Sequence, residues 1–213
     1  MTVVTIMNVA ILPLREIKKQ ATRKRIIETG VRIFTARGIE AATVDEIAAA
    51  ANVGKGTIYN YFETKEDIVV AFMVNIEKKI QHEAMRLSRS SRPLDQVLTK
   101  FLLYHLRSKE PYHGFVRVFM AQMYGGGAAF LRRIVELQKV IDPPLEALFG
   151  RLLDRGLIRD DIELKQLILI FKTLQVGLTT IWAMEGPPWK ASHQLARQQV
   201  RIFCEGIGKG GRE

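Results

Sequence analysis

The sequence predicts an all-α fold, because apolar residues recur at helical spacing along almost the whole chain. Ile68, Phe72, Ile76 and Ile80, for example, follow one another every four residues. Start and stop signals separate the helical stretches, and no stretch alternates between apolar and polar residues as a strand does. With 213 residues, 47% of them hydrophobic, the chain can bury a real core in one domain or two small ones.

Three helices are expected near the N-terminus. The first carries apolar residues on one side and ends at Gly38. The second, Val44 to Ala50, follows a capping box in which the Thr43 hydroxyl and the Glu46 carboxylate each bind a free backbone N–H. After a break at residues 52–54, a short third helix is expected over residues 55–61.

Further start and stop signals predict the remaining helices. Thr64 repeats the threonine-x-x-acid start signal and opens a long amphipathic helix without an internal proline or glycine. Asp142-Pro143-Pro144 is expected to separate two helices, because proline removes a backbone donor. The expected helices after the third are residues 65–88, 93–106, 111–124, 130–140, 145–153, 164–182 and 190–207.

The N-terminal residues and the single cysteine indicate in which cellular compartment the protein is expected. Residues 1–14 are apolar but lack the basic start and the cleavage signal of a secretory leader, and are too short to span a bilayer. We interpret them as a flexible tail or as an upstream start, since Met7 could also begin the protein. Cys204 cannot form a disulfide within the chain, so a cytoplasmic location is expected.

The charge favours a polyanionic partner or an acidic ligand. The formal net charge is +10, and residues 71–140 carry the largest excess, with 12 basic against 5 acidic side chains. The densest basic run lies between Arg15 and Arg25. This run is either a solvated face or a flexible arm that lies along a DNA backbone or in its minor groove.

Two short capped helices after a longer one have the layout of a helix-turn-helix, although many helical bundles contain such a pair. The residue types are more specific. Residues 22–72 resemble the N-terminal DNA-binding domain of the tetracycline-repressor (TetR) family of bacterial transcription regulators. The string Gly54-Lys55-Gly56-Thr57-Ile58-Tyr59-Asn60-Tyr61-Phe62 is similar to that family's recognition helix. The resemblance covers about a quarter of the chain.

Within this motif Ile58 and Phe62 are expected in the core, and the polar residues and glycines have physical reasons to contact DNA. Lys55, in the first helical turn, can reach phosphate or guanine, and Gly56 has no Cβ to hold off a base. Hydroxyl and amide groups can bind phosphate or base edges. The resulting candidate DNA contacts are Thr43, Gly54, Lys55, Gly56, Thr57, Tyr59, Asn60, Tyr61 and Lys65. Many members carry serine where this chain has Gly54, which leaves a backbone N–H as the donor there.

The histidines and glycines of the sequence argue against an enzyme. His82, His105, His113 and His193 are scattered, without ligand spacing, so neither a metal site nor a cofactor is expected. The glycines around Lys55 lack the spacing of a P-loop.

The resemblance implies that the larger part of the chain binds a ligand and forms a dimer. We place domain limits at residues 15–63 for the helix-turn-helix and 64–208 for the effector-binding and dimerisation domain, with a C-terminal tail over 209–213. Soft and aromatic side chains with a few polar groups could surround a cavity. The candidates are Met73, Phe101, Tyr104, His105, Phe119, Met120, Met123, Tyr124 and Phe171. Taken singly, each of them is more typical of plain core than of a pocket.

Helix 164–182 is apolar on every face, so it needs the core on one side and a partner on the other. Together with the last helix it could form a four-helix bundle between two chains. Candidate interface residues are Leu167, Leu174, Leu178, Trp182, Val200 and Phe203.

The leading functional hypothesis is therefore a homodimeric repressor that a small molecule of unknown identity releases from a palindromic double-stranded DNA operator. No membrane partner is expected. One alternative is a helical binding protein or enzyme that retains an unused helix-turn-helix. An activator or a nucleoid-type binder is a third possibility.

Overall fold

A computed structural model describes residues 13–208, and the expected N-terminal and C-terminal tails lie largely outside them. Within this range the chain is helical apart from its turns and one isolated bridge between Ile158 and Gly208, which confirms the all-α prediction. The helices are α1 (Leu14–Arg37), α2 (Val44–Ala50), α3 (Lys55–Tyr59), α4 (Lys65–Ser88), α5 (Leu94–Arg107), the 3-10 helix η1 (Glu110–Tyr112), α6 (His113–Gly125), α7 (Ala128–Asp154), α8 (Leu164–Glu185) and α9 (Lys190–Ile207).

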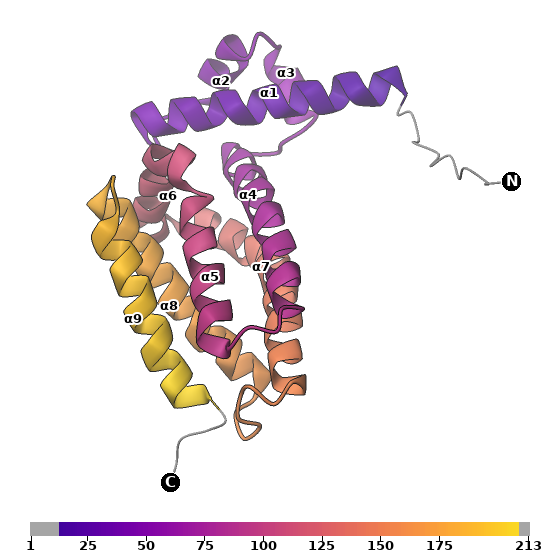
Figure 1. The fold of residues 1–213 in the computed structure, drawn as a ribbon. Coiled ribbons are helices and arrows are strands. Elements are labelled where there is room, and N and C mark those ends of the chain that lie inside the picture. Colours follow the sequence, from indigo (N-terminus) through magenta and orange to yellow (C-terminus); the bar gives the residue numbers. More distant parts are fainter. Residues whose placement is uncertain (1–12, 209–213) are drawn as a thin grey trace, which may run out of the picture.

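The helices form a small N-terminal unit on one end of a larger bundle (Figure 1). α1 lies across the end of the bundle, and α2 and α3 lie on its outer side. α4 leaves this unit and runs along α7, while α8 and α9 pack together at the other side of the bundle. α1 contacts both α4 and α6, so both helices touch the N-terminal unit.

The N-terminal unit closes around its own apolar side chains. Phe34, Ile47, Ile58 and Phe62 are almost completely buried and belong to one continuous core. Both predicted capping boxes are present, at Thr43 before α2 and at Thr64 before α4. Each box satisfies backbone N–H groups that would otherwise lack a partner at the start of a helix.

α1 is longer than the sequence pattern indicated. It starts at Leu14, so the basic run between Arg15 and Arg25 is helical, which corrects the interpretation of that run as a flexible arm. The apolar stripe of α1 begins only at Ile26, because Leu14 and Ile17 before it are exposed. Good helix formers such as Lys, Arg and Glu continue the helix without such a stripe.

α7 is one helix, not the two helices predicted on either side of Asp142-Pro143-Pro144. Each proline removes a donor to the carbonyl four residues earlier. The side-chain amide of Gln81 on α4 donates to the carbonyl oxygen of Val140 at 2.9 Å and replaces the bond that Pro144 cannot make. Lys172 on α8 binds Asp142 at 2.5 Å and holds the same segment.

α8 is buried on one side only. Most of the residues predicted to meet a partner lie on that buried side, so the predicted interface face is wrong. Leu167, Leu178 and Trp182, together with Val200 of α9, are completely buried within the single chain. Phe203 and the half-buried Leu174 border the surface. Because α8 is apolar all round, its periodicity could not indicate which face points inward.

The opposite side of α8 and α9 carries an apolar stripe, which we define as Leu169, Ile170, Leu174, Ile181 and Ile202. These residues border a shallow groove together with Gly177 and Phe203. A side chain at Gly177 would meet nothing, so another helix could approach closely there.

Among the helices within residues 13–208, α8 is the one that is long and apolar enough to cross a membrane. Its most apolar 18-residue window is 44% buried in the fold, and α8 packs against α6, α7 and α9. The core helix of a soluble protein passes the same test of length and composition.

Candidate nucleic-acid interface and interior cavity

α2 and α3 form a helix-turn-helix whose second helix lies on the surface. The turn between them places Asn52 in the left-handed region with φ of 51°, and the Val53 N–H donates to the Ala48 carbonyl oxygen at 3.1 Å. Ile58 anchors the inner side of α3 in the core. The outer side of α3 therefore faces solvent, where a DNA groove could approach (Figure 1).

Most of the predicted DNA contacts share this outer surface. Thr57, Tyr61 and Lys65 are half-buried, and the exposed members are Thr43, Gly54, Lys55, Gly56, Tyr59 and Asn60. The phenol ring of Tyr59 is the largest exposed group of α3, with 49% of the residue accessible. This arrangement brings the candidates together around one short helix, and their contacts with DNA remain a prediction.

Lys55 is paired with a carboxylate that sequence reasoning did not connect to it. Its Nζ lies 2.8 Å from Oδ2 of Asp45 in the first turn of α2. The hydrogen bond and the charge of Asp45 raise the pKa of Lys55. A phosphate that approaches Lys55 would also approach this negative group.

We therefore expect Asp45→Asn to strengthen binding to any duplex by about two- to fivefold, the range typical of one exposed charge pair. The amide keeps the shape of the side chain, removes its repulsion of phosphate and frees the Lys55 ammonium. Fluorescence anisotropy with a labelled random duplex at fixed salt measures the change. Asp95→Asn, in the first turn of α5, is the matched control and should have no effect. An unchanged or weaker affinity of the Asp45 variant would mean that α3 does not face DNA.

Lys65 has a structural contact as well as a possible DNA contact. Its Nζ donates to the carbonyl oxygens of Glu40 and Ala42, at 2.6 and 3.0 Å, and so ties the start of α4 to the loop between α1 and α2. An ammonium has three N–H donors, so one remains for a phosphate.

The two glycines of the motif, Gly54 and Gly56, lie in different surroundings. Gly54 is the N-cap of α3 at φ −69° and ψ 150°, a conformation open to any residue, and a Cβ there would lie 3.7 Å from the Thr57 hydroxyl. A Cβ at Gly56 would meet nothing within 4 Å. The fold of the free chain therefore does not require glycine at either position.

The N-terminal half of α1 extends the positive surface beyond α3. Arg23 lies over the ring of Phe62, 5.2 Å from its centre. The exposed basic residues along this half are Arg15, Lys18, Lys19, Arg23, Lys24 and Arg25. In Figure 1 this half projects past the bundle, where it could follow a DNA backbone.

The larger bundle contains a partly open cavity of about 90 Å³, which we call the interior cavity. It lies among α4 to α8 and is mainly apolar, with polar groups at one side. Its lining residues are Met73, Glu77, His105, Lys109, Val116, Phe119, Met120, Met123, Ile134, Leu137, Gln138, Ile141, Lys172, Gln175, Val176 and Thr179.

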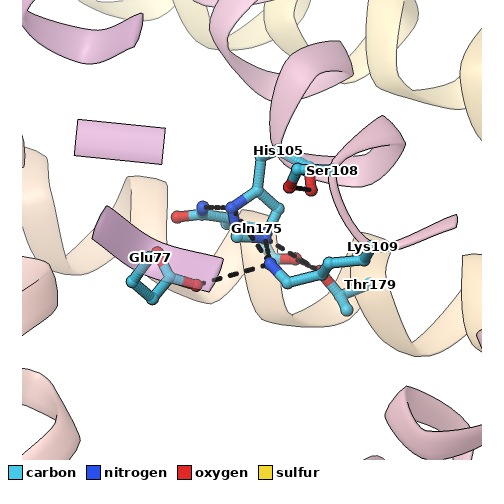
Figure 2. A network of polar contacts seen from close by, with 6 residues as sticks. All are labelled: Glu77, His105, Ser108, Lys109, Gln175 and Thr179. Carbon is cyan, nitrogen blue, oxygen red and sulfur yellow. Dashed lines mark hydrogen bonds and ion pairs between the residues drawn. The ribbon is translucent and has the colours of Figure 1, made fainter. Parts of the chain in front are cut away.

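The polar side is a buried network centred on Lys109 (Figure 2). The Lys109 ammonium lies between the Glu77 carboxylate, 3.5 Å from its Oε1, and the ring nitrogens of His105. Gln175 Nε2 lies 2.6 Å from His105 Nδ1, and the Thr179 hydroxyl donates to the Gln175 carbonyl oxygen at 2.8 Å. Glu77 is 5% exposed and Lys109 2%.

Burial sets the protonation of this network. It lowers the pKa of His105 well below its ordinary value, and the nearby Lys109 charge lowers it further. Burial also lowers the pKa of Lys109, although the charge and hydrogen bond of Glu77 oppose this shift. His105 is therefore neutral at pH 7 and can accept a hydrogen bond from Lys109.

The structure brings only some of the predicted pocket residues together. Tyr104 and Tyr124 lie at the surface, Phe171 packs in the core against Phe101, and Phe101 lines a smaller void beside Glu77. The predicted residues that line the interior cavity are Met73, His105, Phe119, Met120 and Met123. Sequence reasoning missed Glu77 and Lys109, whose charges looked like ordinary surface charges.

Two helices connect the interior cavity to the N-terminal unit. α4 lines the cavity with Met73 and Glu77 and begins at the helix-turn-helix. α6 lines it with Phe119 and Met120. On its other side α6 touches α1 so closely at Gly114 that a Cβ there would lie 2.9 Å from Thr35.

No group of three or more histidine, cysteine or acidic residues that could hold a metal ion occurs within residues 13–208. Cys204 is partly buried, and burial raises the pKa of its thiol to about 12.

Comparison with known proteins points to one family. The model of the bacterial regulatory proteins of the tetR family matches residues 26–72. YhgD of Bacillus subtilis (strain 168), an uncharacterized HTH-type transcriptional regulator, is 26% identical over 167 residues, 78% of this chain and 86% of that protein.

Solved structures share the fold at lower identity. A putative TetR-family regulator from Syntrophomonas wolfei has a TM-score of 0.77 at 13% identity, covering 87% of this chain and 96% of its own. The TetR-family repressor FadR of Thermus thermophilus, in complex with lauroyl-CoA, has a TM-score of 0.69 at 21% identity, covering 90% and 96%. The motif around α3 and the match over residues 26–72 identify the N-terminal unit as a DNA-binding domain of the TetR family of bacterial helix-turn-helix transcription regulators, and the solved structures show that the rest of the chain shares their fold.

Proposed function

We propose that the protein is a homodimeric repressor that binds a palindromic operator in the cytoplasm and leaves it when a small molecule enters the interior cavity. The observation that carries this proposal is the outward face of α3, where the predicted DNA contacts are exposed while Ile58 is buried beneath them. A surface helix of this composition suits a major groove.

The apolar stripe on α8 and α9 supports the dimer. Exposed fractions reach 63% at Leu169 and 64% at Ile202, on helices that pack against each other. Water contact with such a contiguous stripe is unfavourable, and a second copy would cover it with the same stripe. A two-fold dimer would also place two α3 helices on one face of the duplex, roughly 34–36 Å apart or at a multiple of that spacing.

The connection through α4 and α6 supports release by a ligand. A molecule that displaces Met73 or Phe119 pushes on a helix whose other part packs on the N-terminal unit. Gln122 of α6 binds Glu40 at 3.0 Å, and Arg133 of α7 binds Asp67 of α4 at 3.0 Å, so these helices are tied together near the DNA-binding unit. Coupling of this kind is commonly worth about 1–3 kcal/mol and is reciprocal between ligand and DNA.

Selection of bound sequences from a random duplex pool tests the proposal. We expect a palindrome whose half-sites are centred one helical turn, or a small multiple of it, apart. An asymmetric consensus would contradict the two-fold arrangement. Weak, salt-insensitive binding without any consensus would favour a binding protein or enzyme with an unused helix-turn-helix.

A further inference from the structure

Each hydrogen-bond donor group that we consider around the interior cavity already has an acceptor within the chain. Lys109 contacts both Glu77 and His105, and Lys172 is bound to Asp142 at 2.5 Å. The Thr179 hydroxyl donates to the Gln175 carbonyl oxygen. A ligand that only accepts hydrogen bonds would therefore have to share a donor group that already has a partner in the chain.

The acceptors that face the cavity are less well satisfied. The ammonium of Lys109, at 3.5 Å, is the one polar partner that the described part of the chain offers to the Glu77 carboxylate. An ionised carboxylate has about four acceptor sites. The side-chain oxygen of Gln138 is buried and has no hydrogen-bond partner within residues 13–208. Unsatisfied buried acceptors of this kind gain free energy from a donor on a ligand.

The charges around the cavity already balance. Glu77 offsets Lys109, and Asp142 offsets Lys172. An anionic or a cationic ligand would add a buried charge without a partner, which is strongly unfavourable. This balance outweighs the basic excess of residues 71–140, which favoured an acidic ligand when only the sequence was considered.

The size and the lining restrict the ligand further. The cavity measures about 90 Å³, whereas pockets for drug-sized ligands measure roughly 300–1,000 Å³. An apolar cavity of about 150 Å³ holds benzene. Met73, Met120 and Met123 line the cavity, and methionine is unbranched and adaptable, so small movements of these side chains would admit one ring.

We propose that the interior cavity binds an uncharged, mainly apolar molecule of about one ring that carries a hydroxyl or N–H group, and that this group donates to the Glu77 carboxylate. Phenol is the simplest such molecule. This inference names the effector class of the proposed repressor and therefore rests on the proposed function.

Four ring compounds of similar size test the inference on the full chain: phenol, toluene, benzoate and benzylammonium. Methionine methyl signals in ¹³C NMR report binding, since three methionines line the cavity and Met184, which is 79% exposed, serves as an internal control. We expect phenol to shift the cavity methionines with at least about tenfold higher affinity than toluene. Benzoate and benzylammonium should cause no saturable shift over the same concentrations.

Two variants test the role of the acceptors. Glu77→Gln should weaken phenol binding about tenfold and leave toluene unchanged, because an amide oxygen is a poorer acceptor than a carboxylate. Gln138→Leu removes the second acceptor without touching the ion pair, so it remains informative if the Glu77 variant does not fold. It should weaken phenol about threefold or more, whereas the exposed control Gln96→Leu should change nothing.

Several results would overturn the inference. Toluene binding as tightly as phenol would mean that no polar group is recognised. Tighter binding of benzoate, benzylammonium or lauroyl-CoA than of phenol would mean a charged or much larger ligand. If the chain selects a palindrome but does not bind phenol, the effector class is wrong and the proposed function stands. If it binds phenol but selects no palindrome, the proposed function fails by itself.

Discussion

Leu169→Glu combined with Ile181→Glu should convert the protein into a monomer and lower its operator affinity about a hundredfold or more. Both side chains lie on the apolar stripe and are exposed in the single chain, at 63% and 44%, so the fold should tolerate the change. In a two-fold dimer the variant would bury four carboxylates without partners, at a cost of several kcal/mol each. Each half-site would then be bound by a separate chain, and the gain from linking the two would be lost.

Sedimentation velocity measures the change in oligomeric state, and anisotropy on the selected duplex measures the change in affinity. Leu131→Glu combined with Val135→Glu is the matched control, since both residues are exposed apolar positions on α7 outside the stripe. The control should remain dimeric and bind normally. A double variant of the stripe that still forms dimers would show that the stripe is not the interface.

Gly56→Ala should make the free protein more stable and make it a poorer DNA binder. Alanine is favoured over glycine within a helix by about 0.5–1 kcal/mol, and the added methyl group meets nothing in the free chain. In the complex the same methyl would occupy the space into which a phosphate or base approaches. We expect operator affinity to fall about tenfold or more while the melting temperature rises.

Gly150→Ala is the control that separates the effect on stability from the effect on DNA binding. Gly150 lies within α7, and a Cβ there also meets nothing within 4 Å. It should give a similar gain in stability with unchanged DNA binding. If the Gly56 variant also kept its full affinity, the close approach of DNA to α3 would be wrong.

The N-terminal unit could be predicted from sequence because its signals are local. Thr43 and Thr64 each lie three residues before their capping partners, and both boxes form as expected. Gly38 ends α1 at φ 84°, a conformation that few other residues adopt. The motif from Gly54 to Phe62 is a single contiguous string.

The remaining features depend on contacts between distant positions. α7 continues through Pro144, where Gln81 from another helix binds the Val140 carbonyl oxygen that this proline leaves free. Glu77 and Lys109 form a pair across 32 residues, and no periodicity marks either as buried. The inward face of α8 is chosen by packing against several helices, since its own sequence is apolar all round.

The central claim, that two α3 helices of a two-fold dimer read one palindrome, is tested most directly by comparing a full selected palindrome with a single half-site. Titration of both duplexes, with native mass spectrometry to count the chains bound, gives affinity and stoichiometry together. We predict two chains on the full site and at least about a hundredfold weaker binding to the half-site. One chain bound to each duplex with equal affinity would contradict the account.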